Sequence, residues 1–152
     1  MNIVYLGLGS NIYPRLFYIY SALNKITETI GQIEKQSSIY LTEPWKMPEN
    51  TPFFYNLCIC AKTHLQPQQI LQKIVSIEKT LGRTKKTTTG NHYESRTIDI
   101  DILLFNHDII QSDNLTIPHP FLSQRKFVLL PLSEIASDVE HPVLKKKIRE
   151  LL

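Results

Sequence analysis

Two stretches of the chain carry apolar residues at helical spacing, and each is bounded by residues that start and stop helices. The first stretch lies between Pro14, which suits the first turn of a helix, and Gly31, which ends the pattern. The second lies between Pro67 and Gly82. The apolar positions are Leu16, Ile19, Leu23, Ile26 and Ile30 in the first, and Ile70, Leu71, Ile74, Ile77 and Leu81 in the second. We therefore predict two amphipathic helices.

Four runs rich in β-branched and aromatic residues are expected strands: residues 2–8, 33–41, 53–62 and 97–105. With the helices they give the order β-α-β-β-α-β, the split arrangement of ferredoxin-like folds. The sequence predicts one α+β domain, residues 1–152, in which two helices pack on an antiparallel or mixed sheet. A corner at Pro118-His119 and helical pieces near residues 126–135 and 143–152 are expected C-terminal additions.

Composition excludes several classes of protein. No apolar run approaches the roughly 20 residues of a membrane span, and no signal peptide is evident, so we expect a cytoplasmic location. The net charge of +3 is too small to argue for nucleic acid by itself. The two cysteines, Cys58 and Cys60, are expected to be free buried thiols, since no further ligands at zinc spacing accompany them.

The run SRTIDIDILLF places two carboxylates on one face of the last expected strand. Side chains alternate along a strand, so Thr97, Asp99 and Asp101 share a face while the intervening isoleucines share the other. Carboxylates about 6.5–7 Å apart can converge on one point, and unpaired they would repel each other. If this face of the sheet is open to water, the two aspartates need have no catalytic or metal-binding role. A site for one or two Mg²⁺ ions explains them better, because carboxylates hold Mg²⁺ together with substrate phosphates.

A basic loop leads directly into this strand and carries Arg83, Lys85, Lys86 and Arg96. Such a run is often only a solvated loop, but here it brings cations beside the expected metal ligands. Cations and Mg²⁺ around one anion are what phosphoryl-transfer chemistry needs. The P-loop signature is missing, and the third glycine of G-x-G-x-x-G would fall on Ile12. Gly7 and Gly9 are interpreted as a tight turn and a close backbone approach.

The stretch TEPWKMPENTPFFYN combines a proline-stiffened loop with flat rings and an amide. Phe54 and Asn56 alternate onto one strand face, beside Trp45. A ring and an amide side by side suit a flat heterocycle. The ring can stack on its face, and the amide can form hydrogen bonds with its edge. Core packing is the alternative, both here and for Phe127, which could supply a second stacking wall.

These motifs occur together in one order: GLGSN, the TEP loop with FYN, LGR, SRTIDIDILLF, IPHP and QRKFVLLPL. In this the chain resembles the 6-hydroxymethyl-7,8-dihydropterin pyrophosphokinases of folate biosynthesis over nearly its whole length. The resemblance implies a ferredoxin-like sandwich that works as a monomer on small molecules, without nucleic acid or membrane partners. It also implies diphosphate transfer from ATP to the pterin hydroxymethyl group, with two Mg²⁺ ions and attack at the β-phosphorus.

The resemblance further implies a role for each matching residue. Asp99 and Asp101 would hold both metal ions and, with Arg83 and Arg96, form the catalytic set. The pterin-binding residues would be Thr42, Pro44, Trp45, Phe54, Asn56 and Phe127. The ATP-binding residues would be Leu71, Glu78, Arg83, Lys85, Arg96, Ile102, Thr116, His119 and Arg125. Lys85 stands where the family often has arginine, Tyr93-Glu94-Ser95 replaces a frequent Trp-Gly-Pro, and Val75 stands where a polar residue can occur.

Two rival functions remain open at this point. The same element order builds RNA-recognition modules, although their basic-glycine-aromatic signature is absent here. A two-metal nuclease or other phosphohydrolase would also use paired aspartates, with water as the nucleophile.

In the transferase, Asp101 is the best candidate general base. Residues 42–52 and 83–95 are expected to close over the substrates and exclude water.

Overall fold

The computed structural model describes residues 1–82 and 95–152. The strands are β1 (Asn2–Ser10), β2 (Gln32–Gln36), β3 (Tyr40–Thr42), β4 (Phe54–Thr63), β5 (Asp99–Phe105), β6 (Ile110–Gln111) and β7 (Thr116–Ile117). The helices are α1 (Arg15–Thr29), α2 (Pro67–Thr80) and α3 (Lys126–Ala136), with short 3₁₀ turns at Leu122–Gln124 and Ile148–Leu151. No helix in these residues is long and apolar enough to cross a bilayer.

The main sheet has the order β2-β4-β1-β5, and the short β3 extends it by pairing with β4. Each of these ladders is antiparallel. The predicted α+β class, with helices packed on an antiparallel sheet, is therefore confirmed. A separate hairpin, β6–β7, follows β5.

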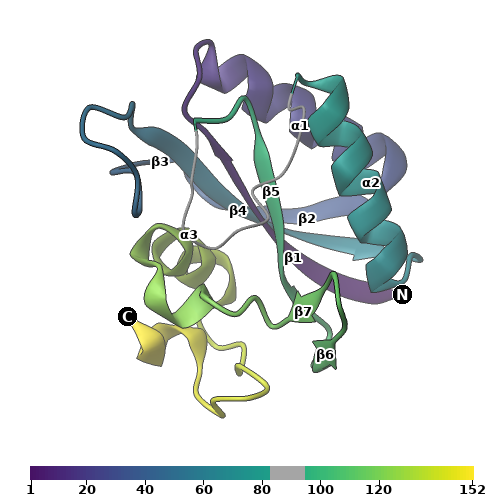
Figure 1. Cartoon of the computed structure of the whole chain (residues 1–152). Coiled ribbons are helices and arrows are strands. Elements are labelled where there is room, and N and C mark those ends of the chain that lie inside the picture. Colours follow the sequence, from purple (N-terminus) through teal and green to yellow (C-terminus); the bar gives the residue numbers. More distant parts are fainter. Residues whose placement is uncertain (83–94) are drawn as a thin grey trace.

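Helices α1 and α2 cover one face of the sheet, and α3 lies on the other (Figure 1). The face under α1 and α2 buries the isoleucines of β5 with the predicted apolar stripes of both helices. Of the first stripe only Leu16 differs, since it is 43% exposed. Gly82 has φ +102°, a left-handed conformation that favours glycine, and it ends α2 as expected.

The opposite face is divided between a core and an open region. Cys58 of β4 and the pair Leu103 and Leu104 of β5 pack under α3. A register shift against β1 between Tyr5 and Leu6 lets these successive leucines both join that cluster. Nearer the start of β5, the same face carries the aspartates. The thiol of Cys58 is inert, because burial raises its pKa well above the usual range.

The predicted single strand over residues 33–41 is wrong, since the chain breaks it into β2 and β3. At the break, the buried Ser37 donates its backbone N–H to Cys58 O (2.9 Å), and its hydroxyl accepts the Cys58 N–H (2.9 Å). The next residue turns toward α3, where the Glu134 carboxylate accepts the Ser38 N–H and the Tyr40 hydroxyl. These bonds to β4 and α3 replace the regular ladder.

Gly31 links α1 to β2 at a point where the backbone of β4 passes closely. A Cβ at this position would lie 2.0 Å from the Lys62 carbonyl oxygen, a rigid backbone atom. We expect Gly31→Ala to lower the free energy of unfolding by about 2 kcal/mol or more, because a strand must shift to relieve the clash. Urea unfolding measures this, and a value within about 0.5 kcal/mol of wild type would contradict it.

The predicted helix over residues 143–152 is also wrong, since only Ile148–Leu151 forms a 3₁₀ turn. The buried His141 organises the preceding segment, where its Nδ1 accepts the N–H groups of Val143 (3.2 Å) and Leu144 (3.1 Å). Ile148 is then inserted beneath α3. Side-chain hydrogen bonds and one apolar anchor close the domain here in place of a helix.

The imidazole of His141 makes this segment sensitive to acid. Burial lowers its pKa from 6.5, so the unfolded state binds the proton more tightly than the folded state. The wild-type protein should lose stability as pH falls below about 6.5. His141→Asn keeps an acceptor but does not titrate, so its free energy of unfolding should fall less between pH 7 and 5. Parallel pH profiles for the two proteins, measured by urea unfolding, would rule this out.

Candidate active site

Two cavities lie along β5. The first has an empty volume of about 440 Å³ with its mouth included, and its lining comprises Gly9, Thr42, Glu43, Trp45, Met47, Phe54, Asn56, Arg96, Asp99, Arg125 and Phe127. The second, about 1100 Å³ by the same measure, is lined by Leu71, Ile74, Ile100, Asp101, Ile102, Asp113, Asn114, Leu115, Thr116, His119 and Pro120. Asp99 lines the first cavity, and Asp101, the next residue on the same face of β5, lines the second, so this strand face places one carboxylate in each cavity.

The floor of the first cavity is a row of three residues across three strands. In the antiparallel register, Gly9 of β1 lies between Asn56 of β4 and Asp99 of β5. A Cβ on Gly9 would lie 2.5 Å from the Asn56 Oδ1 and 3.4 Å from the ring of Phe54. The expected close approach at this glycine is present, and it leaves room for the ring and the amide on one face. The expected tight turn is wrong, because Gly7 and Gly9 both lie inside β1 and pair with β4 and β5.

The amide of Asn56 is held in one orientation. Its Nδ2 donates to the hydroxyl of Thr42, on the paired strand β3. Oδ1 therefore points over Gly9, where it can accept a hydrogen bond from a ligand. Phe54 and Phe127 line the same cavity, so ring faces and an oriented amide surround one space.

Basic side chains stand beside both carboxylates. The Arg96 Nη1 lies 3.1 Å from the Asp99 Oδ2, and both side chains are largely buried. The His119 Nε2 lies 4.0 Å from the Asp101 Oδ1. The Arg96 guanidinium relieves part of the repulsion between the carboxylates.

Two carboxylates suit Mg²⁺, which is usually held by one or two protein oxygens and takes its other ligands from substrate phosphates and water. The described residues contain no cluster of three or more His, Cys, Asp or Glu side chains that could enclose a metal by themselves. The donor set therefore fits a metal that arrives with a phosphate ligand.

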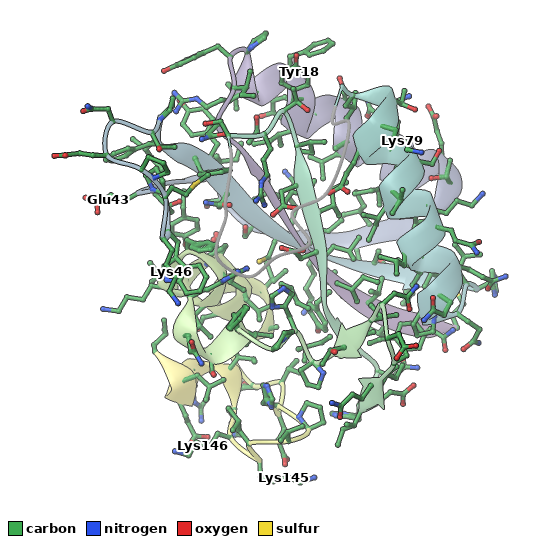
Figure 2. All side chains as sticks on the ribbon, viewed as in Figure 1. Tyr18, Glu43, Lys46, Lys79, Lys145 and Lys146 are labelled. Atoms are coloured by element: carbon green, nitrogen blue, oxygen red, sulfur yellow. The ribbon has the colours of Figure 1, made fainter. Side chains whose placement is uncertain are left out.

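Arg125 lies in the first cavity, away from most of the residues assigned to the nucleotide. It is 7% exposed, and its guanidinium carbon lies 4.5 Å from the ring of Trp45, 5.1 Å from Phe121 and 5.5 Å from Phe127. Trp45 thus belongs to an aromatic cluster that sandwiches a buried cation. Figure 2 shows Lys46 on the outer side of the loop between β3 and β4, which also carries Trp45.

The structure brings most other expected residues to the two cavities. Leu71, Ile102, Thr116 and His119 line the second one. Glu78 is buried and is absent from both linings, and its carboxylate accepts the N–H of Ile100, between the two aspartates (2.9 Å). Pro44 is half-buried between Thr42 and Trp45. Arg83 and Lys85 lie outside the described residues, so their roles remain predictions.

One residue of the site was not singled out by the sequence analysis. Asn11, the last residue of GLGSN, is 1% exposed and bonds to Pro52, Ser95 and Arg96. The sequence analysis noted the motif GLGSN but interpreted it as a turn. An asparagine in a turn and one buried between three segments look the same in a sequence.

Two neighbouring carboxylates that line two cavities, with an arginine and a histidine beside them, are the arrangement expected of an enzyme that transfers a phosphate-containing group. Comparison with known proteins agrees. The sequence model of the 7,8-dihydro-6-hydroxymethylpterin-pyrophosphokinase (HPPK) family matches residues 5–137. The chain belongs to this family, and it is therefore a pyrophosphokinase, a diphosphotransferase of folate biosynthesis.

Individual relatives are similar over most of their length. A 2-amino-4-hydroxy-6-hydroxymethyldihydropteridine pyrophosphokinase of Aquifex aeolicus is 43% identical over 150 residues, which cover 99% of this chain and 90% of that protein. The Bacillus subtilis protein of the same name is 40% identical over 140 residues, or 91% and 81% of the two chains.

Among solved structures, Plasmodium falciparum HPPK-DHPS with pteroate superposes with a TM-score of 0.82 at 21% identity. The match covers 99% of this chain but only 43% of the Plasmodium chain, and it supports the fold alone.

Proposed function

We propose that this protein transfers the terminal diphosphate of ATP to the hydroxymethyl group of 6-hydroxymethyl-7,8-dihydropterin, releasing AMP. The observation that carries the proposal is that Asp99 and Asp101, neighbours on one face of β5, line two cavities of different character. One is aromatic and amide-bearing, which suits a flat heterocycle. The other has apolar walls that suit a base, with His119 and Asp101 where metal-bound phosphates would lie.

In the first cavity, Phe54 and Phe127 would stack on the pterin ring. The Oδ1 of Asn56 would accept a hydrogen bond from its pyrimidine edge, because Thr42 occupies the amide nitrogen. This orientation would direct the hydroxymethyl group toward the aspartates. A site built to pair a polar edge strongly rejects analogues that lack it.

In the second cavity, Leu71, Ile74 and Ile102 would pack on the base, and His119 and Thr116 would lie along the phosphates. Asp99 and Asp101 would hold two Mg²⁺ ions, which when bound neutralise the phosphates and acidify the attacking hydroxyl. Arg96 would remain beside Asp99 and face the transferred group, and Arg83 and Lys85 would add to the positive charge. Asp101 is the candidate to receive the proton of the hydroxyl.

The finer fold assignment is part of the same proposal. The order β2-β4-β1-β5 with antiparallel ladders supports a ferredoxin-like arrangement, in which β3 is an added segment and α3 a C-terminal one. We also propose that residues 1–152 act as one domain and as a monomer. The expected cytoplasmic location remains a prediction from the sequence.

The decisive assay supplies ATP, Mg²⁺ and 6-hydroxymethyl-7,8-dihydropterin and measures all products. We expect one AMP for each pterin consumed, no AMP when the pterin is omitted, and no turnover with excess EDTA. Release of ADP and orthophosphate, or of AMP without pterin, would instead indicate a phosphohydrolase. Binding of single-stranded RNA without Mg²⁺ would favour the recognition module.

A further inference from the structure

We propose that Arg15, the first residue of α1, is a positioning residue that fixes the start of β4 and with it the aromatic wall of the first cavity. The inference rests on the proposed function for the identity of the ligand, a pterin. Arg15 is absent from both cavity linings, so it would act on the ligand through the strand that it holds.

The guanidinium of Arg15 is enclosed by two tyrosine rings. Its central carbon lies 4.0 Å from the centroid of the Tyr55 ring and 4.4 Å from that of Tyr13. Nη2 also donates to the Tyr13 hydroxyl (3.0 Å), and Nη1 donates to the carbonyl oxygen of Phe53 (2.9 Å). Among basic side chains, only a planar guanidinium can stack on rings and donate several hydrogen bonds from its edge. Arg15 is therefore held in one geometry.

These contacts act where β4 begins. Phe53 precedes the strand and Tyr55 lies within it, so Arg15 holds the chain on both sides of Phe54. The ladders give this end limited support, because the pairing with β3 ends at Phe54 and the pairing with β1 ends at Tyr55. Tyr55 packs toward the core under α1 and α2, while Phe54 and Asn56 alternate into the first cavity. Arg15 thus ties the strand of the pocket to the helix on the other face of the sheet.

A strand end fixed in this way keeps Phe54 and Asn56 ready for a ligand. Holding a site in its bound geometry strengthens binding, because the ligand need not order it. The second cavity is lined by α2, β5 and the segment 113–120, and the four contacts of Arg15 all lie outside that lining. We therefore expect pterin affinity to depend on Arg15 and nucleotide affinity to be nearly independent of it.

Two substitutions of Arg15 test this dependence. Arg15→Met keeps a long apolar stem without donors or charge, and Arg15→Lys keeps the charge without the planar group. Calorimetric titration with 6-hydroxymethyl-7,8-dihydropterin, with a saturating non-hydrolysable ATP analogue and Mg²⁺ present, should show at least 5-fold weaker binding in both. Affinity for the analogue alone should stay within about 3-fold of wild type. The KM for pterin should rise with the dissociation constant, while kcat changes less than 3-fold.

Amide hydrogen exchange separates positioning from a general loss of stability. In Arg15→Met, the amides of residues 54–56 should exchange at least 10-fold faster than in the wild-type protein. Those of residues 59–61, in the middle of the same strand, should keep their protection. A fall in global stability would accelerate both groups, whereas fraying of the strand end accelerates only the first.

Tyr13 offers a second test that leaves Arg15 in place. Its side chain is 71% exposed, so Tyr13→Leu removes one ring and the Nη2 acceptor with little loss of core packing. This variant should bind pterin at least 3-fold more weakly, and in the Arg15→Met background it should have no further effect. Leu16→Ala is the matched control, since it changes the next residue of α1, which is 43% exposed, and should bind pterin as wild type does.

The outcomes separate the two proposals. Wild-type pterin affinity in Arg15→Met or in Arg15→Lys overturns this inference alone, and so does an equal loss of affinity in Leu16→Ala. If no Arg15 variant folds, unchanged pterin affinity in Tyr13→Leu overturns it. Equal acceleration of exchange along the whole of β4 would reduce Arg15 to a general structural role. Absence of pterin-dependent AMP from the wild-type protein would refute the proposed function instead.

Discussion

Replacing Asp101 with alanine is expected to reduce diphosphate transfer by at least roughly 1000-fold, because it removes one of the two proposed metal ligands. The side chain lines the second cavity and is partly exposed, so no core packing is lost. Removing one of two like charges should, if anything, favour the folded state. The rate is measured as AMP formed per pterin consumed, and folding by urea unfolding.

The matched control for this variant is Asp108→Asn, which neutralises an exposed aspartate in the turn after the same strand. It should keep near-normal activity. Calorimetry adds a readout that does not depend on turnover: Mg²⁺ should strengthen nucleotide binding to wild-type protein and to Asp108→Asn, but much less to Asp101→Ala. Near-normal turnover in Asp101→Ala, or a wild-type nucleotide affinity indifferent to Mg²⁺, would refute the metal assignment.

Substituting Gly9 with alanine is expected to weaken pterin binding roughly 10- to 100-fold, about 1–3 kcal/mol, while nucleotide binding stays within a few-fold of wild type. The new methyl group would lie 2.5 Å from the Asn56 Oδ1, the end of a side chain that can turn away. The fold should therefore survive. The Asn56 amide would lose both its hydrogen bond to Thr42 and its orientation toward the cavity.

Gly7→Ala is the control for this prediction, because the nearest atoms to a Cβ there would be those of the Leu103 side chain, at 3.5 Å and beyond, which is an ordinary contact. Both variants place a methyl group on the same face of β1, and only Gly9→Ala disturbs the amide. Calorimetric titrations with pterin and with a non-hydrolysable ATP analogue give the affinities for pterin and for nucleotide. Equal pterin affinities in Gly7→Ala and Gly9→Ala would show that the Asn56 orientation does not matter.

Much of the architecture was readable from periodicity. The stripes of α1 and α2, the alternation along β5 and the shared face of Phe54 and Asn56 were all predicted, because side-chain direction is a local property of helix and strand.

The failures of prediction share a different cause. The break between β2 and β3 depends on Ser37 bonding to β4 and on Glu134 reaching back from α3. The end of the chain depends on His141 and on the slot that receives Ile148. Each is a contact between segments distant in sequence, which local patterns do not contain.

By itself, the sequence determined the two amphipathic helices and the principal strands, the faces on which the aspartates and the pocket residues lie, and the family of the chain. Only the tertiary structure decided how three strands align Asn56, Gly9 and Asp99 in one row, where Arg125 is buried, and why Gly31 must be small. It also showed that Asn11 bridges three segments. The physical reason is that periodicity sets the direction of a side chain within its own element, whereas its neighbours are set by the register and packing of other elements.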